Sequence, residues 1–167
     1  MKTALKSNLF FLALAVTATI LIYSCGTDTV TNTTTTPDAG TISGTITFVD
    51  TTRVYNNGYY DISAYSSWPP AGPPSASDTI KITKNNNVYT GTYKIKGLTG
   101  GASYVLAAAW IKTPYGPGSV YVLGLKGCDT VETCYNNPTP VVLPSNQGLA
   151  DVNFKAFIDT SKTHVKF

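Results

Sequence analysis

The chain has 167 residues, a formal net charge of +3 and charged side chains at only 13% of its positions. Its basic residues are scattered along the chain, whereas a nucleic-acid partner would require a clustered basic surface to bind the phosphates. Composition and charge therefore argue against nucleic-acid binding.

The first 24 residues are organised like a secretory signal peptide. Lys2 and Lys6 give a basic start, residues 9–23 form an apolar run without charge, and the small residue Ser24 ends it. The run is too short to cross a membrane, because a spanning helix needs about 20 apolar residues. Cleavage after Ser24 would leave ten basic and nine acidic side chains, which makes the mature protein nearly neutral.

The segment that ends this run, Ile22-Tyr23-Ser24-Cys25, resembles the lipobox of bacterial lipoprotein precursors. In that family a dedicated signal peptidase cuts before the cysteine. The cysteine sulfur then carries a diacylglycerol and the new amino terminus carries a third acyl chain. The resemblance implies a lipid anchor on Cys25, on the periplasmic or surface face of the outer membrane. Three acyl chains would hold the protein firmly, because stable anchoring needs more than one chain. The alternatives are an ordinary secretory signal with an incidental cysteine, and a buried apolar strand.

Residues 25–40 are expected to form a tether. The segment is rich in threonine, and its apolar residues follow neither the period of a helix nor that of a strand. As a random coil it would hold a domain about 20 Å from the membrane. Within it, Asp28-Thr29-Val30 is similar to the Asp-Ser/Thr-apolar acceptor of a general bacterial O-glycosylation system, a resemblance that implies Thr29 as a modified residue.

Residues 41–167 are predicted to form one all-β domain of about 127 residues, long enough to bury a core. In the segment 41–48, apolar residues and glycine alternate with threonine and serine, which is typical of a half-buried strand. The same alternation recurs at Tyr60–Ala64, Ile80–Ile82, Tyr89–Ile95, Val120–Val122 and Val152–Ile158, and Pro140–Leu143 could add a short edge strand.

Tyr104–Ile111 differs from these strands because it is apolar on both faces. Such a run predicts a central strand that is covered on each side. Between the predicted strands lie turn residues, among them Asn85-Asn86-Asn87 and Gly97–Gly101. Seven or eight short strands separated by such turns predict a β-sandwich.

Two segments of this domain resemble the carboxypeptidase regulatory-like, transthyretin-like (prealbumin-like) family. They are Gly40–Ile46, which reads GTISGTI, and Gly91–Leu106, which reads GTYKIKGLTGGASYVL. In that family the first segment opens a Greek-key sandwich, and the second forms a strand that leads through a glycine turn into the next strand. The resemblance implies a seven- to eight-stranded Greek-key sandwich, and it says little about function because the module serves many exported proteins.

Two of the three cysteines, Cys128 and Cys134, are expected to pair. They are separated by five residues and would lie in an oxidising compartment. A disulfide there would hold one exposed loop in shape. The alternative is a metal or redox pair. Zinc usually needs four ligands, however, and these two thiolates have no histidine nearby to add to them.

The sequence offers little support for catalysis. The only histidine is His164 and the only glutamate is Glu132. No nucleophile elbow, phosphate-binding loop or metalloprotease helix motif is present, although spacing alone leaves paired-carboxylate glycosidase chemistry open. We therefore expect no catalytic residues, no metal and no cofactor.

Eleven tyrosines and two tryptophans point to a binding role, because aromatic rings with polar edges stack on sugars or on partner chains. Trp68 lies in a segment rich in proline and serine, where we expect it to be exposed with few partners. Tyr65, Tyr115 and Tyr135 also flank turns and are candidate ligand-binding residues, although tyrosine is common in half-exposed strands too. Trp110 is expected in the core.

The sequence therefore predicts a membrane-anchored envelope lipoprotein whose β-domain acts as a non-catalytic binding module for a glycan or a peptide. The alternative is a structural component of an envelope assembly, in which an exposed strand edge pairs with a partner protein.

Overall fold

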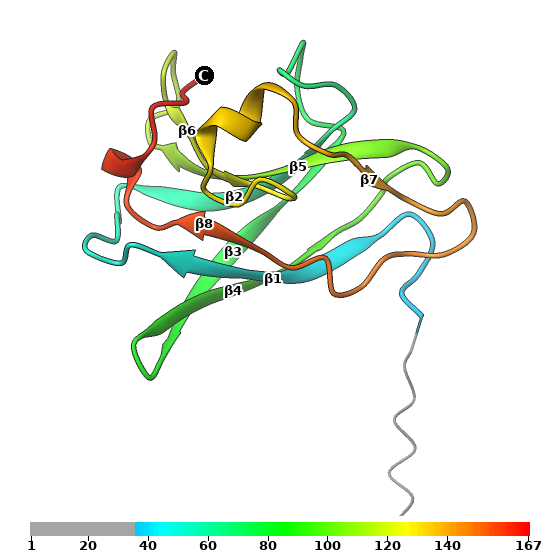
Figure 1. Ribbon diagram of the computed structural model, residues 1–167, viewed down its shortest axis with the longest axis horizontal. Helices are drawn as coiled ribbons and strands as arrows, with labels where there is room; N and C mark the ends of the chain where they lie inside the picture. The colour runs from blue at the N-terminus through cyan, green and yellow to red at the C-terminus, as the bar shows by residue number, and fades with distance from the viewer. Residues whose placement is uncertain (1–35) are drawn as a thin grey trace, which may run out of the picture. The chain divides into compact units, whose positions relative to one another are not determined.

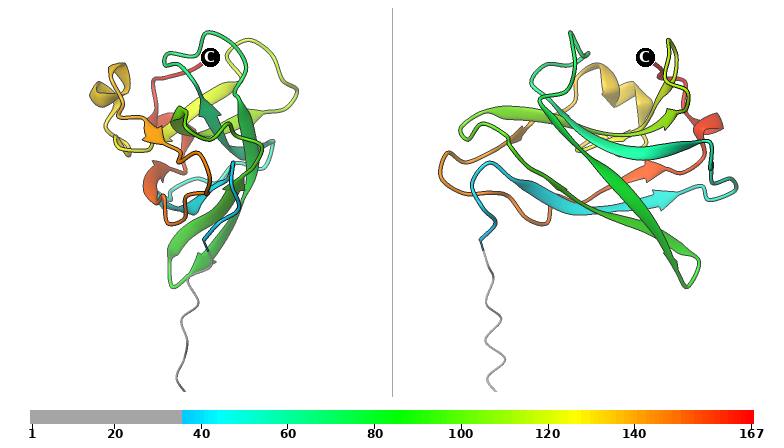
Figure 2. Two further views of the ribbon diagram at one scale, coloured as in Figure 1. Left: turned by 90° about the vertical axis from the view of Figure 1, so that its right-hand side faces the viewer. Right: turned by 180° about the vertical axis from the view of Figure 1, so that it is seen from behind.

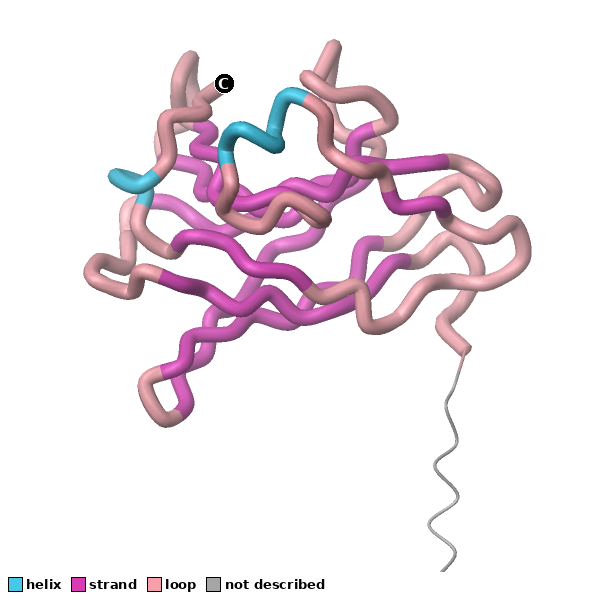
Figure 3. Tube along the Cα trace, viewed as in Figure 1, coloured by secondary structure: helices cyan, strands magenta, loops and turns pink. Residues whose placement is uncertain are grey.

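Eight strands and two short 3-10 helices make up the part of the chain that the computed structural model describes, residues 36–167 (Figures 1 and 3). The elements are β1 (Ile42–Val49), β2 (Gly58–Tyr65), β3 (Ala76–Asn85), β4 (Val88–Ile95), β5 (Ser103–Lys112), β6 (Val120–Leu125), η1 (Glu132–Asn136), β7 (Val141–Val142), β8 (Phe154–Phe157) and η2 (Thr160–Lys162). The predicted all-β class is confirmed, and every strand expected from the periodicity is present.

The predicted signal peptide, the lipidation site Cys25, the glycosylation site Thr29 and most of the tether lie outside the described residues. Among residues 36–167, no helix has the length and apolar character that a membrane span requires.

The strands form one mixed sheet in the order β6-β5-β2-β3-β4-β1-β8, and β7 pairs with β5. β3 belongs to both halves of the sheet. Its first residues pair with β2, and its last residues, from Lys81 to Asn85, pair with β4. Figure 2 shows β3 and β4 as a long diagonal hairpin. The two layers expected of a sandwich are therefore continuous through β3, and the sheet curls into a nearly closed barrel.

A side chain caps the backbone where β3 leaves β4. Beyond the pair Lys81–Thr92 the ladder stops, and the carboxylate of Asp78 accepts the Lys94 backbone N–H at 2.8 Å. This contact satisfies a donor that would otherwise lose its partner strand. Asp78 thus supplies the acceptor that β3 no longer offers to this backbone group of β4.

Closure of the barrel depends on a glycine in β6. A Cβ atom built on Gly124 would lie 2.5 Å from the carbonyl oxygen of Lys155 in β8, so only glycine permits this approach. The carboxylate of Asp129 accepts the Lys155 backbone N–H at 3.1 Å. β8 therefore meets β6 through close packing, and the loop after β6 adds one side-chain hydrogen bond to β8.

The hairpin between β3 and β4 follows from its asparagines. Asn86 and Asn87 have φ angles of 47° and 62°, the left-handed values that a two-residue type I′ turn requires. Asparagine adopts this conformation more readily than most residues, so the predicted turn at Asn85-Asn86-Asn87 is confirmed.

The interior of the barrel is the main hydrophobic core. It contains the alternating apolar residues of β1, together with Ile62, Ile95, Leu106 and Trp110. Trp110 is only 2% exposed and packs against Tyr55 and Tyr121, with ring centroids 5.1 Å and 5.4 Å away. The prediction that Trp110 is a core residue is confirmed.

Candidate functional site

A second apolar cluster lies on the opposite face of β5 from the main core. Its buried members are Val105, Ala107, Val122, Leu125, Cys128 and Tyr135, and the half-buried residues Tyr65, Trp68, Cys134 and Val165 pack against them. Loops, rather than a second sheet, cover the outer side of β5. The apolar residues on both faces of this strand are therefore buried. This outer cluster contains most of the residues that the sequence marked as candidates.

The loop that carries η1 is closed by a disulfide. Cys128 and Cys134 are bonded, with Cα atoms 5.5 Å apart, as the sequence predicts. The Tyr135 hydroxyl donates to the carbonyl oxygen of Asp129 at 2.9 Å, and Asp129 itself has a left-handed φ of 53°. The disulfide and this hydrogen bond fix the loop over the outer face of β5.

Trp68 is half-buried rather than free. Its Nε1–H donates to the carbonyl oxygen of Tyr135 at 2.7 Å. Its ring meets those of Tyr65 and Phe167 edge to face, with centroids 5.7 Å and 5.8 Å away. The expectation that Trp68 has few partners is therefore wrong, because residues distant in the sequence supply them. Figure 1 shows η1, the gold coil, at the same end of the domain as the loop after β2.

The three candidate tyrosines have different environments. Tyr135 is buried, with 4% exposure, so its proposed role as a ligand-contacting ring is wrong; burial raises the pKa of its hydroxyl above the ordinary value. Tyr65 is half-buried beside Trp68, and burial raises its pKa too. Tyr115 is 75% exposed in the loop between β5 and β6. Among the four candidate aromatic residues, Tyr65 and Trp68 are the pair whose partly exposed rings lie next to one another.

A cleft of about 250 Å³ lies beside Trp68. It separates the loop after β2 from the segment that follows η1. Its lining residues are Ser66, Ser67, Trp68, Ser103, Val105, Asn136, Asn137, Pro138 and Pro140.

The lining contains hydroxyl and amide groups, an indole ring and two prolines, but no charged side chain. Ser66, Ser67, Asn136 and Asn137 are exposed, so their polar groups are available to a ligand. Hydroxyls and amides both donate and accept hydrogen bonds, and the indole offers an apolar surface. This chemistry suits an uncharged ligand that carries many hydroxyl groups.

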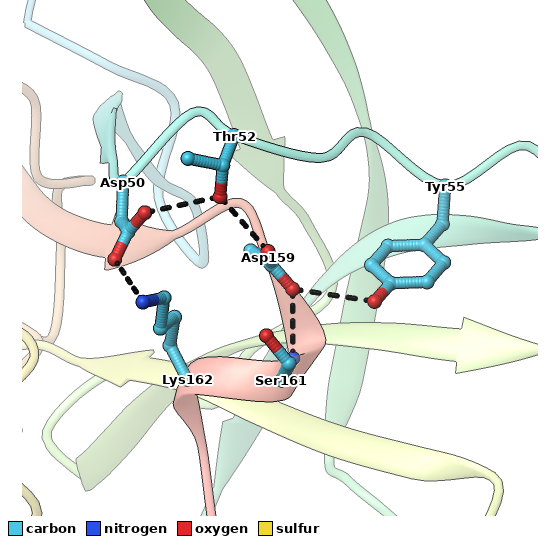
Figure 4. Close-up of polar contacts among 6 residues, drawn as sticks. All are labelled: Asp50, Thr52, Tyr55, Asp159, Ser161 and Lys162. Atoms are coloured by element: carbon cyan, nitrogen blue, oxygen red, sulfur yellow. Dashed lines mark hydrogen bonds and ion pairs between the residues drawn. The ribbon is translucent and has the colours of Figure 1, made fainter.

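A separate polar cluster lies between the loop after β1 and η2 (Figure 4). Asp159 accepts the Ser161 backbone N–H at 2.8 Å, the Tyr55 hydroxyl at 3.2 Å and the Thr52 hydroxyl at 3.0 Å. Burial would raise the pKa of Asp159, but these hydrogen bonds outweigh it and lower the pKa. Lys162 forms an ion pair with Asp50 at 3.2 Å. The cluster attaches the loop after β1 to η2 and holds Tyr55 over Trp110, which is a structural role.

The only histidine also has a structural role. Glu132 in η1 accepts the His164 backbone N–H at 2.7 Å, and its second oxygen lies 3.0 Å from His164 Nδ1. Partial burial would raise the pKa of Glu132, but the hydrogen bonds from His164 lower it overall. The contact holds the segment 165–167, which pairs with β6 through backbone bonds between Val120 and Phe167. Glu132 therefore fastens the chain segment that places Phe167 against Trp68.

Sequence reasoning missed the serines and asparagines of the cleft. Ser66 and Ser67 directly precede Trp68, and Asn136 and Asn137 directly follow Tyr135, so each pair adjoins a residue that the sequence did mark. The missing information was the contact between Trp68 and Tyr135, which joins positions 67 residues apart. Polar pairs next to candidate aromatics were the signal available in the sequence.

No family model matches this chain, and comparisons with curated proteins and with solved structures found no match either.

Proposed function

We propose that this protein is a lipid-anchored lipoprotein of the bacterial cell envelope, and that it acts as a non-catalytic module that binds a glycan in the cleft beside Trp68. The observation that carries the proposal is the lining of the cleft, in which exposed serines and asparagines surround a half-buried indole without any charged side chain. Sugars offer the matching combination of hydroxyl groups and apolar ring faces.

The cleft is held in place before any ligand arrives. Trp68 is fixed by its hydrogen bond to Tyr135, and the loop that carries Asn136 is fixed by the disulfide. A site that is already ordered loses less conformational entropy on binding. This rigidity favours specific recognition over loose adhesion.

The location and the fold type belong to the same proposal. The lipobox resemblance at residues 22–25 supports an anchor on Cys25 and a place on the outer membrane. The eight strands, and the segments GTISGTI, which overlaps β1, and GTYKIKGL, which overlaps β4, support a Greek-key, transthyretin-like domain. The threonine-rich tether, with a glycan acceptor at Thr29, would hold this domain away from the membrane.

An array of neutral oligosaccharides, probed with the full-length protein in a neutral detergent, tests the proposal. We expect binding to a defined group of sugars, and Asn136→Ala should weaken it about tenfold, because an amide contributes more than one hydrogen bond. Asn146→Ala is the matched control, since Asn146 is also exposed but does not line the cleft. Absence of sugar binding, or equal loss in both variants, would contradict the proposal.

The second candidate function is a scaffold that pairs through a strand edge. The structure gives this function less support, because the edge strands of the barrel already have hydrogen-bond partners within the protein. Segment 165–167 pairs with β6, and Asp129 bonds to the backbone of β8. β7 remains, but it has only two residues. A pull-down that recovers a protein partner, together with no sugar binding, would favour the scaffold or a peptide-binding role.

A further inference from the structure

The outward face of strands β3, β4, β1 and β8 carries a regular array of threonines. Thr45 pairs with Thr92 and Thr47 pairs with Thr90, side by side on β1 and β4. Thr83 of β3 extends the second row, because it pairs with Thr90. Paired residues point to the same face of a sheet, and the other face of these strands holds the main core. The five threonines therefore lie together on the outside.

Lysines stand at two opposite corners of this array. Lys81 pairs with Thr92 at the β3 end of one row, and Lys155 pairs with Thr47 at the β8 end of the other. Strands lie about 4.8 Å apart, so a row across four strands spans roughly 14 Å. Both lysines are exposed, and neither has an ion-pair partner among residues 36–167. We call this surface the threonine face.

A second cleft, of about 530 Å³, borders the threonine face at β8. It is formed by the disulfide loop and the β1–β8 pair, and its lining residues are Thr47, Lys126, Gly127, Cys128, Asp129, Val131, Asn153, Phe154 and Lys155. Lys126 adds a third cation there. The carboxylate of Asp129 accepts the Lys155 backbone N–H, and the Asn153 amide oxygen accepts the Thr45 backbone N–H at 2.7 Å. The amide nitrogen of Asn153 remains as a donor.

We propose that the threonine face and the adjoining cleft bind an anionic polysaccharide, whose carboxylate or sulfate groups pair with Lys81, Lys155 and Lys126 while its hydroxyls contact the threonines. Charge complementarity argues for this occupant, because the cations outnumber the one carboxylate in the cleft. Hydroxyl side chains supply donors and acceptors for sugar hydroxyls. This site is separate from the uncharged cleft beside Trp68 and does not depend on it.

The same chemistry argues against two other polyanions. Single-stranded nucleic acid is bound by proteins that stack its bases on aromatic rings, whereas the one aromatic side chain in the lining of this cleft, Phe154, is buried at 5% exposure. A membrane surface would require apolar side chains that insert between the lipids, whereas the centre of this face consists of threonines. An extended chain of hydroxylated sugars fits the surface better than either.

The test measures binding of the full-length protein, in neutral detergent, to immobilised polygalacturonate, dextran sulfate and uncharged dextran. We expect binding to one or both polyanions that is clearly stronger than binding to dextran. Lys81→Gln/Lys155→Gln should weaken it about tenfold, since charge-assisted hydrogen bonds are stronger than neutral ones. Lys112→Gln/Lys166→Gln, which removes the same charge elsewhere, should have little effect.

A threonine variant separates direct contact from general attraction. Thr45→Val/Thr92→Val keeps the shape and charge of the face and removes two hydroxyls, and we expect two- to threefold weaker binding, about the effect of one net hydrogen bond. Trp68→Ala should leave polyanion binding unchanged, so failure here is distinct from failure of the Trp68 cleft. Equal losses in both lysine pairs, no binding to either polyanion, or full competition by millimolar glycerol phosphate, a lipid headgroup, would overturn the proposal.

Discussion

The two faces of β5 are buried in different ways. On the inner face, Leu106 and Trp110 pack against side chains of the surrounding strands, within the continuous sheet. On the outer face, Val105 and Ala107 are covered by loops that a disulfide and a few hydrogen bonds hold in place. The inner core fixes the fold, whereas the outer cluster shapes the cleft. We therefore expect changes inside to unfold the domain and changes outside to act locally.

The largest effect is expected at Trp110. Trp110→Ala should lower the free energy of unfolding by about 3 to 5 kcal/mol, because it empties a large buried site. The indole N–H of Trp110 has no hydrogen-bond partner among the described residues, so Trp110→Phe should cost clearly less. Urea unfolding of both variants provides the measurement. A smaller loss in Trp110→Ala than in Trp68→Ala would refute the contrast between the two regions.

Removal of the disulfide comes next. Cys128→Ala/Cys134→Ala should lower the free energy of unfolding by about 2 kcal/mol, the value expected from closing so short a loop. Hydrogen exchange should accelerate at η1 while the amides of β2 and β5 stay protected. Uniformly faster exchange throughout the barrel would mean that the loop is part of the main folding unit.

Trp68→Ala should have a smaller effect, about 1 to 2 kcal/mol. The ring is half-buried and loses one hydrogen bond, and such a bond contributes about 1 kcal/mol. Trp68→Phe keeps part of the packing but loses the donor, so the difference between the two variants isolates the ring contacts. Thermal unfolding of the pair is the measurement, and a loss as large as that of Trp110→Ala would place Trp68 in the main core.

The smallest effect concerns pH. Hydrogen bonds from His164 lower the pKa of folded Glu132, so its stabilising contribution is present above its unfolded pKa and is lost as the pH falls through the folded value. Below the ordinary pKa of 4.5, as Glu132 takes up a proton, we therefore expect the Phe167 amide, which bonds to Val120, to lose protection relative to its intrinsic exchange rate. Glu132→Gln should remove this pH dependence. An unchanged profile in the variant would exclude Glu132 as the titrating group.

The sequence predicted what depends on local pattern. Alternation in residues 41–48 identified β1, and the short spacing of Cys128 and Cys134 identified their bond. The apolar context of Trp110 placed it in the core, because a strand with two apolar faces has to be covered on both sides.

The predictions that failed, or could not be made, depend on contacts between residues that lie far apart in the sequence. Trp68 looked exposed because its neighbours in the chain are prolines and serines, yet its partners are Tyr135 and Phe167. Likewise, the threonines of β1 were visible as a polar face, but their alignment with those of β4 depends on strand register, which pairs positions far apart. A pattern within one segment does not encode these pairings.

The most direct test of the proposed function is an NMR titration of isotope-labelled full-length protein with the neutral oligosaccharide that binds best on the array. We predict shifts of the Trp68 indole N–H and of the backbone amides of Ser66, Ser67, Asn136 and Asn137, with no change in the β3–β4 hairpin. Shifts that cluster away from this cleft, or no shifts at saturating sugar, would contradict the assignment of the Trp68 cleft as the glycan site.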